Sequence, residues 1–255
     1  NSLMLSEGPL GKGWAHNYET RLEAQADGSI KLRWSANREN DFTSTDQINF
    51  TSGENACRLD KLVKNVDGSY TLTRKDQSQY FFDASGRLTE ERNGTGQALQ
   101  MSYDSNGKLQ TISEPLSGIA LNLAYDGSGL LQSVSDNLNR QWSFTCDSSH
   151  NLTDIQYPNG NSSAFTYDSV GQVLSETDPQ GNLLFLNTYD DQGRVVSQDD
   201  GVSGNQLSTL VYDDASQPGF RITTITDRTG HSRQYIHDSS YQLVQVIDEL
   251  GNQTQ

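Results

Sequence analysis

Residues 82–109 read FDASGRLTEERNGTGQALQMSYDSNGKL and contain one unit of a repeat that recurs along most of the chain. An aromatic residue followed by aspartate begins this stretch and returns near its end. The eight copies of this pair, with cysteine or histidine twice in the aromatic place, are Phe82-Asp83, Tyr103-Asp104, Tyr125-Asp126, Cys146-Asp147, Tyr167-Asp168, Tyr189-Asp190, Tyr212-Asp213 and His237-Asp238. Successive aspartates are 21, 22, 21, 21, 22, 23 and 25 residues apart, which indicates a repeat array.

Each aspartate opens a predicted turn of the form D-x-x-G-x-L. Aspartate in the first position can accept hydrogen bonds from the following backbone N–H groups, and glycine in the fourth can adopt a positive φ without a Cβ clash. The glycines predicted to hold these turns are Gly86, Gly107, Gly129, Gly171 and Gly193. A second turn follows about ten residues later, as in Asp178-Pro179-Gln180-Gly181. Each repeat is therefore predicted to contain two strands and two turns.

The strand that enters each first turn alternates apolar and polar residues with a period of two. Its apolar positions are Leu99, Met101 and Tyr103, then Leu121, Leu123 and Tyr125, then Trp142, Phe144 and Cys146, then Phe165 and Tyr167. Stacked repeats would align these side chains in ladders, so we expect buried tyrosine rings whose hydroxyls bond at the rim or to the next repeat. This expectation covers Tyr103, Tyr125, Tyr167 and Tyr189. Cys146 occupies a tyrosine place, which favours a small buried hydrophobe over a reactive thiol.

The strand that leaves each first turn is less regular. Leucine stands five residues past the aspartate, and isoleucine or valine stands eight past it, as in Ile112, Val134 and Ile155. Side chains an odd number of residues apart would point to opposite faces of a regular strand. The spacing therefore predicts either a β-bulge or a strand with apolar contacts on both faces.

The residues before about 75 lack the repeat but have similar composition. Asp27-Gly28 and Asp67-Gly68 are predicted hairpin turns between apolar runs. Residues 56–63 place a few apolar side chains at helical spacing, which predicts at most two turns of helix. We predict that residues 1–66 form an N-terminal hairpin or capping segment and that residues 67–255 form the array.

Composition narrows the class of protein. The 33 Asp and Glu residues against 18 Lys and Arg give a formal charge of -15, which argues against a nucleic-acid partner. No apolar run approaches the roughly 18 residues that span a bilayer, so we expect no membrane span. Hydrophobic residues make up only 33% of the chain, which favours thin layers of sheet over one thick core. The predicted fold is all-β, with antiparallel hairpin repeats forming a curved, spiralling strip.

The sequence offers little that points to catalysis. It contains no G-x-S-x-G, Walker, H-E-x-x-H or dinucleotide-binding motif. The histidines His16, His150, His231 and His237 are scattered, and Cys57 and Cys146 form no zinc motif. Carboxylate pairs such as Asp190-Asp191 could hold calcium or hydrolyse glycans, but aspartate at one phase of eight copies indicates turn chemistry. We predict no enzyme, no catalytic or metal residues and no cofactor.

The Tyr-Asp pair, the D-x-x-G-[RK]-L turn and the interval of about 21 residues resemble the YD repeats of RHS proteins. That group includes bacterial polymorphic toxins, the B and C subunits of insecticidal toxin complexes and the animal teneurins. The resemblance covers about residues 67–255, and residues 9–14, PLGKGW, are similar to the segment that introduces the repeats in bacterial members. It implies a strip that spirals into a hollow shell, part of which this chain would form, and which encloses a C-terminal effector in the toxins.

One departure from that group concerns its self-cleavage motif, D-P-x-G-L. Asp178-Pro179-Gln180-Gly181 is only similar to it, because Asn182 stands where leucine is expected. The stretch is also in phase with the second turn of the repeat. We therefore interpret it as a structural turn.

Two functions follow as hypotheses. In the first, the chain is a non-catalytic wall of a bacterial protein that is secreted or delivered extracellularly. Its partners would be the remaining repeats and the C-terminal effector domain of the full-length protein. In the second, the chain is an extracellular adhesion module of teneurin-like type that binds a glycan or a cell-surface protein.

Overall fold

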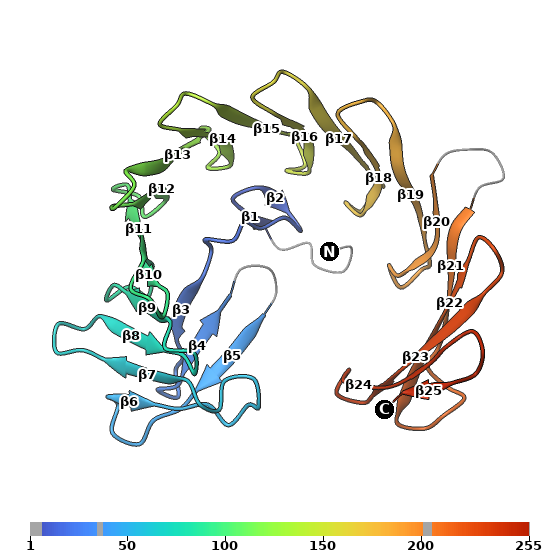
Figure 1. Cartoon of the computed structure of the whole chain (residues 1–255), viewed down its shortest axis with the longest axis horizontal. Coiled ribbons are helices and arrows are strands. Elements are labelled where there is room, and N and C mark those ends of the chain that lie inside the picture. Colours follow the sequence, from blue (N-terminus) through green and yellow to red (C-terminus); the bar gives the residue numbers. More distant parts are fainter. Residues whose placement is uncertain (1–6, 35–37, 201–205, 255) are drawn as a thin grey trace. The chain divides into compact units, whose positions relative to one another are not determined.

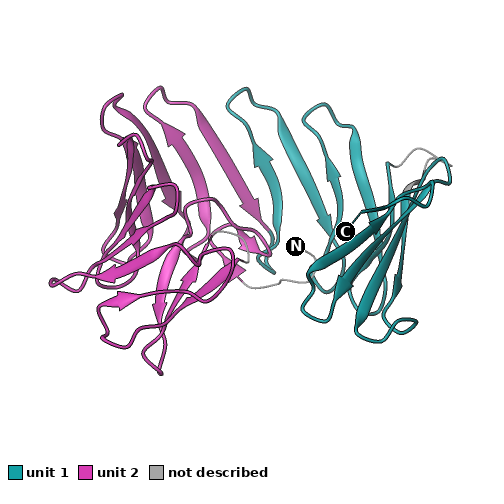
Figure 2. Ribbon diagram, turned by 60° about the horizontal axis from the view of Figure 1, so that its bottom comes forward, with its two compact units in different colours: residues 1–6, 147–255 teal, residues 7–146 magenta. Residues whose placement is uncertain are grey.

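The computed structural model describes residues 7–34, 38–200 and 206–254 (Figure 1). Asn1 to Met4 and Gln255, which the sequence places in the predicted capping segment and in the array, lie outside the described residues. The chain divides into two compact units, residues 1–6 with 147–255 as unit 1 and residues 7–146 as unit 2 (Figure 2). In the part that the structure describes, no helix is long and apolar enough to span a membrane.

Unit 2 contains a two-stranded sheet, a three-stranded sheet and a long antiparallel sheet. The two-stranded sheet pairs β1 (Glu7–Gly8) with β2 (Gly11–Lys12). The three-stranded sheet is formed by β3 (Arg21–Ala24), β4 (Ile30–Arg33) and β5 (Glu39–Phe42). The long sheet follows the order of the sequence through β6 (Asn49–Phe50), β7 (Lys61–Lys64), β8 (Tyr70–Thr73), β9 (Gln79–Phe82), β10 (Leu88–Arg92), β11 (Ala98–Tyr103), β12 (Leu109–Glu114), β13 (Ile119–Tyr125), β14 (Leu131–Asp136) and β15 (Gln141–Cys146).

Unit 1 continues the same pattern of consecutive antiparallel hairpins. Its strands are β16 (Leu152–Gln156), β17 (Ser162–Tyr167), β18 (Val173–Thr177), β19 (Leu183–Tyr189), β20 (Val195–Asp199), β21 (Gln206–Asp213), β22 (Phe220–Asp227), β23 (Ser232–Asp238), β24 (Leu243–Ile247) and β25 (Gln253–Thr254). Each strand pairs with its neighbours in sequence. The predicted all-β fold of antiparallel hairpins is confirmed.

The core of unit 2 lies between two layers. The β3–β5 sheet lies on the concave side of the long sheet of this unit (Figure 1). Leu32 and Phe42 from the small sheet are fully buried in one cluster with Leu62 and Leu72 from the long sheet. Burying four such side chains contributes roughly 1.5 to 3 kcal/mol each, so this second layer stabilises the first part of the chain.

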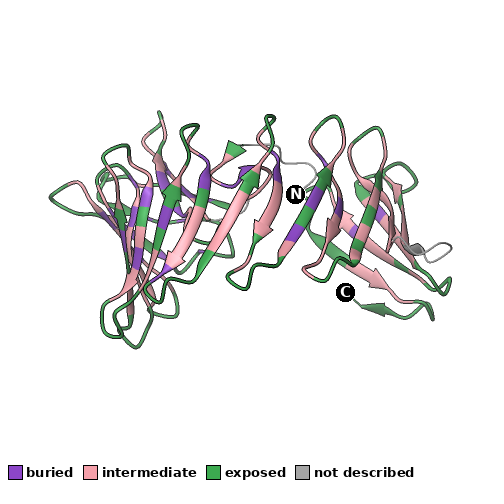
Figure 3. Ribbon diagram, turned by 90° about the horizontal axis from the view of Figure 1, so that it is seen from above, coloured by how far each residue is buried: buried purple, intermediate pink, exposed green. Residues whose placement is uncertain are grey.

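Unit 1 has far fewer buried apolar side chains among its described residues. They are Leu152, Phe165, Ile222 and Ile236. Leu184 and Leu186 of β19 are 46% and 43% exposed. Figure 3 shows this contrast in burial along the sheet. The predicted thin layers of sheet therefore describe unit 1 well, whereas unit 2 is thickened by its N-terminal strands.

The β-bulge alternative is the one that the structure contains. Tyr103 pairs with Leu109 and Ser102 pairs with Thr111, so Gln110 is the extra residue. The same shift in register occurs after Ala124, Thr166 and Thr188. The bulge turns Leu109 and Ile112 to one face despite their odd spacing, and both are buried.

The predicted helical spacing in residues 56–63 does not produce a helix. Residues 55–59 form turns, and Leu62 and Val63 lie in β7. Leu62 pairs with Phe50 on one side and Leu72 on the other, so burial between strands overrides the local spacing. Gly28 and Gly68 do hold hairpin turns, with φ of 84° and 86°. The division at residue 66 stays a prediction, since the compact units divide inside the predicted array.

Candidate functional site

The first turn of each repeat is built around its aspartate. In the turn at Asp83, the Asp83 N–H donates to Arg87 O and the Gly86 N–H donates to Asp83 O, each at 2.9 Å. The Asp83 carboxylate accepts the N–H groups of Ser85 and Arg87, also at 2.9 Å. Gly86 adopts φ of 82°, which suits a residue without a Cβ atom. One carboxylate thus binds two backbone N–H groups of the turn, and backbone-to-backbone bonds close the rest.

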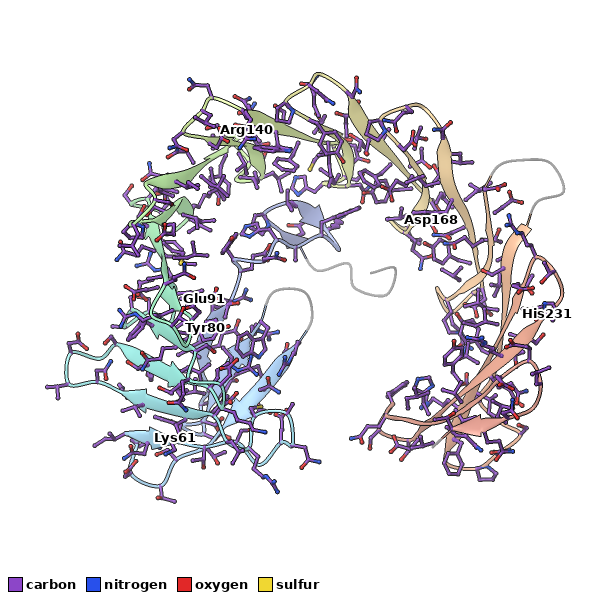
Figure 4. The ribbon with its side chains drawn as sticks, viewed as in Figure 1. Lys61, Tyr80, Glu91, Arg140, Asp168 and His231 are labelled. Atoms are coloured by element: carbon purple, nitrogen blue, oxygen red, sulfur yellow. The ribbon has the colours of Figure 1, made fainter. Side chains whose placement is uncertain are left out.

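The other predicted positions occupy equivalent turns. The carboxylates of Asp104, Asp126, Asp168 and Asp190 each accept two backbone N–H groups in the same way. Gly107, Gly129, Gly171 and Gly193 have positive φ. Asp213 accepts the N–H groups of Ala215 and Ser216, because the insertion around Pro218 changes its turn. Figure 4 labels Asp168 in a first turn and His231 beside a second turn of unit 1.

In two of the first turns another residue takes the positive φ of the glycine, and sequence reasoning did not identify which residue it is. His150 and Tyr241 stand three residues past Asp147 and Asp238, with φ of 64° and 60°. Their position in the sequence, three residues past the aspartate, was the signal that could have identified them. A non-glycine residue at positive φ costs roughly 1 to 2 kcal/mol, so the hydrogen bonds of the aspartate must hold these turns against strain.

Five repeat tyrosines each connect their own repeat to the one before it. Every hydroxyl donates to the backbone carbonyl of the leucine or valine five residues past the preceding aspartate. The pairs are Tyr103 to Leu88 at 2.7 Å, Tyr125 to Leu109 at 2.8 Å, Tyr167 to Leu152, Tyr189 to Val173, and Tyr212 to Val195 at 2.8 Å. Burial raises the pKa of Tyr103 and Tyr125 to about 12, so both phenols remain protonated donors at neutral pH.

The tyrosine rings differ from expectation in their exposure. Tyr103, Tyr125, Tyr167 and Tyr189 are half-buried rather than buried. Each ring ends at the rim of the sheet, where its hydroxyl bonds the carbonyl of the neighbouring repeat. Phe82 begins the array and is buried, because it packs in the two-layer core. Cys146 is also half-buried rather than buried.

Basic side chains that follow the turn glycines make a second connection, which sequence reasoning did not identify. The Arg87 guanidinium bonds Asp83 at 2.7 Å and lies 5.0 Å from the centre of the Tyr103 ring. Lys108 lies 5.0 Å from the Tyr125 ring. Arg194 repeats the arrangement with Asp190 and lies 4.2 Å from the Tyr212 ring. Each contact contributes roughly 0.5 to 1 kcal/mol at an exposed site.

A cavity of about 250 Å³ in unit 2 lies between the N-terminal segment and the ladder. Its lining includes His16, Glu19, Lys108, Tyr103 and Tyr125. The Tyr18 N–H donates to His16 Nδ1 at 3.2 Å, which leaves the proton of a neutral ring on Nε2. Burial lowers the pKa of His16 to about 4, and burial also raises the pKa of Glu19.

A second hollow of about 310 Å³ lies in unit 1. It is lined by Ile225, Asp227, His231, Arg233, Tyr235 and Glu249. Arg233 Nε donates to Glu249 at 2.9 Å. The hollow therefore combines the phenol ring of Tyr235 with side chains that can donate and accept hydrogen bonds.

Other candidate chemistry falls into structural positions. Among the described residues, no three His, Cys, Asp or Glu side chains are grouped as metal ligands. Cys57 is buried, and burial raises the pKa of its thiol. Asp178 closes a turn with Gly181, whose N–H donates to Asp178 O at 2.9 Å. Hydrogen bonds from Asn182 hold the pKa of Asp178 below its usual value. The D-P-x-G stretch is thus a second turn like the others.

Comparison with known proteins identifies two family models in the chain. The Teneurin YD-shell model matches residues 67–195, and a domain of unknown function, DUF6531, matches residues 1–42. No curated protein matches the chain.

Several solved structures are similar to the chain at low identity. The Tc holotoxin pore of Photorhabdus luminescens is 12% identical, with a TM-score of 0.34, over 88% of this chain and 18% of that one. A TcdB2–TccC3 crystal structure described as TcdB2-TccC3-TEV is 12% identical, with a TM-score of 0.34, over 92% of this chain and 20% of that one. A TcdB2-TccC3-Cdc42 structure is 13% identical, with a TM-score of 0.34, over 86% and 18%. The chain thus spans about a fifth of the length of these structures.

Proposed function

Since the chain belongs to the YD-repeat family of RHS proteins and teneurins, we propose that it is a wall segment that encloses or scaffolds the C-terminal effector domain of a longer protein. In this proposal its partners are the remaining repeats and that effector, and the protein is secreted or delivered extracellularly by a bacterium. The residues of the turns and of the tyrosine ladder serve the wall and carry no chemistry of their own. Residues 1–66 would cap the array of residues 67–255.

The observation that carries the proposal is the direction of the bonds between repeats. In all five bonds the tyrosine hydroxyl donates to the repeat immediately before its own. An array whose units bond mainly to their neighbours extends by adding units and does not close around a central core. Such an array suits a wall, because its area grows with each added repeat.

The half-buried sheet of unit 1 supports the same proposal. Leu184 and Leu186 leave apolar surface exposed on β19, and Val211 on β21 is 62% exposed. Exposed apolar side chains on a sheet are stabilised when another surface covers them. An enclosed domain is a suitable cover.

Proteolysis of the full-length protein tests enclosure. Trypsin should leave the effector domain intact in the full-length protein and digest the same domain faster when it is produced alone. Tyr189→Ala removes a ring and its bond to Val173, so it should open the wall and increase cleavage of the effector. Tyr241→Ala is the matched control, since Tyr241 is 68% exposed. Equal digestion of the effector with and without the repeats would contradict enclosure. The stability of Tyr189→Ala would still show whether the tyrosine bond holds neighbouring repeats together.

A second candidate function is glycan binding by a teneurin-like adhesion module. The hollow in unit 1 favours it, because an aromatic ring beside paired charged side chains can stack on a sugar and bond its hydroxyls. A glycan array probed with the purified chain tests this function. Binding should be lost in Tyr235→Ala and Arg233→Ala and kept in Tyr241→Ala. An array without bound glycan, or binding that all three variants keep, would contradict it.

The wall proposal also implies that the chain catalyses no reaction. Purified chain should therefore hydrolyse neither glycans nor peptides. An activity that a single Asp or Glu substitution abolishes without unfolding the chain would contradict this part of the proposal.

A further inference from the structure

Neighbouring repeats separate at the first-turn end, and a tyrosine fills the space between them. The pairing of β10 with β11 reaches Glu90 and Gln100 and goes no further toward that end. Beyond it, the Tyr103 hydroxyl bonds Leu88 O directly. The side chain therefore takes the place of further strand pairing.

The repeat at Cys146 has the same separation but no tyrosine. The pairing of β14 with β15 reaches Ser133 and Ser143 and goes no further toward the first turn, so Leu131 and Cys146 lie in the unpaired part of this interface. A cysteine side chain has neither a ring to fill the space nor a phenol to bond a carbonyl. We call the space between Leu131 and Cys146 the ladder gap.

The tip of the N-terminal hairpin occupies the ladder gap. Strands β1 and β2 pair through Gly8 and Gly11, so Pro9 and Leu10 form the tip between them. The Leu131 N–H donates to Pro9 O at 2.7 Å. Cys146 Sγ lies 3.8 Å from Leu10 O, and Leu10 is buried. Figure 1 shows this hairpin inside the curve of the long sheet of unit 2.

The same segment contacts the array a second time at its first repeat. The Leu22 N–H donates to Gly86 O at 2.8 Å. A Cβ atom at Gly86 would lie 2.2 Å from Leu22 O, so the backbones touch. We call residues 7–22 the strap, since it is attached at both of these places. The cavity of about 250 Å³ is the space left between the strap and the rings of Tyr103 and Tyr125.

We propose that Cys146 is the specificity-determining position for the strap: the missing tyrosine at this one interface creates the space that the Pro9–Leu10 tip requires. A tyrosine ring at residue 146 would fill that space and exclude the tip. The strap thereby docks at one interface of the array and not at the similar ones beside it.

The other copy without tyrosine does not offer the same space. His237 pairs directly with Arg221, inside a run of pairs from Phe220 with Asp238 to Thr226 with Ser232. The insertion around Pro218 lies just before β22, which pairs with β23 from its first residue, Phe220, so strand pairing fills the region that a tyrosine fills elsewhere. The absence of tyrosine creates a gap only where the strands also separate.

Substitution of Cys146 by tyrosine tests the proposal on the whole chain. Cys146→Tyr should release the tip, so trypsin should cut after Lys12 at least about tenfold faster, because cleavage follows the population of the open segment. Cys146→Ala keeps the gap and should leave the rate unchanged. Ser148→Tyr adds the same ring at an exposed turn residue and controls for a general effect. Equal cleavage in Cys146→Tyr and the wild-type chain would overturn the proposal.

A second measurement keeps the proposal testable if Cys146→Tyr does not fold. Deletion of residues 7–12 removes the whole hairpin, including the Pro9 and Leu10 carbonyls that contact the array. Cys146 should then react with dithiobis(nitrobenzoic acid) about tenfold faster, since reaction requires access to the thiol. Cys57 is 1% exposed and serves as the internal control. An unchanged rate at Cys146 would show that the tip does not cover the gap and would overturn the proposal.

Discussion

Replacement of Tyr125 by phenylalanine isolates the bond between two repeats. The Tyr125 hydroxyl donates to Leu109 O at 2.8 Å, and the ring lies beside the Lys108 ammonium at 5.0 Å. Tyr125→Phe keeps the ring and this contact, and removes only the O–H donor. The carbonyl that loses its donor belongs to a residue only 6% exposed.

The expected loss follows from what happens to that carbonyl. A net hydrogen bond contributes about 1 kcal/mol to the free energy of unfolding, and a buried acceptor left without a donor costs about 1 to 3 kcal/mol. We expect about 1 to 2 kcal/mol for Tyr125→Phe, the lower part of this range, because the tyrosine side chain is only half-buried. Tyr125→Ala also removes the ring and should cost about 3 to 5 kcal/mol.

Tryptophan fluorescence in urea is the suitable assay. The three tryptophans are Trp14, Trp34 and Trp142, and all lie in unit 2 with Tyr125. The signal therefore reports the unfolding of one unit, which avoids averaging over two. Tyr241→Phe, at an exposed residue of unit 1, is the control and should change nothing. If the free energy of unfolding of Tyr125→Phe lies within about 0.3 kcal/mol of the wild-type value, the bond is not a stabilising link. Differences of that size are no larger than the usual scatter between independent mutations.

The features predictable from the sequence are those that a single turn determines. Asp83 and Gly86 are three residues apart, and their hydrogen bonds close within the same turn, so their spacing reveals the geometry. The odd spacing of Leu109 and Ile112 indicates either a bulge or apolar contacts on both faces before any contact is known, and the register in the structure selects the bulge. Burial of the tyrosines was overestimated because alternation gives the face of a strand and not the thickness of the layer that covers it.

The features that escaped prediction depend on contacts between distant residues. Nothing in the local sequence relates Leu10 to Leu131 and Cys146. From the sequence alone, Cys146 is therefore interpreted as a small apolar residue in a tyrosine place. The cations beside the rings of Tyr103, Tyr125 and Tyr212 escaped prediction for a related reason. Arg87 belongs to one repeat and Tyr103 to the next, and only the pairing of their strands brings them together.

The remaining predictions concern the strap and the basic side chains. Gly86→Ala should destabilise unit 2 by about 1 to 3 kcal/mol more than Gly96→Ala in urea melts, because both have positive φ but only Gly86 lies against Leu22 O; equal losses would contradict that contact. Lys108→Met removes a cation beside Tyr125 and should cost about 0.5 to 1 kcal/mol, with no loss if the charge contributes nothing. His16 gives a pH dependence of defined sign. Its pKa is about 4 in the folded chain against 6.5 as the ordinary value, so its contribution is complete above pH 6.5 and is lost as the pH falls toward 4. The full loss is about 3 kcal/mol for a side chain 16% exposed. Glu19, whose pKa is raised, acts in the opposite sense, because its protonation stabilises the folded chain as the pH falls. The effect of His16 is therefore measured against His16→Asn, which keeps Glu19 but cannot take up a proton at residue 16. Lowering the pH from 7 to 4.5 should reduce the urea midpoint of unfolding more in the wild-type chain than in His16→Asn. An equal reduction in the two chains would show that burial in the strap does not hold His16 neutral.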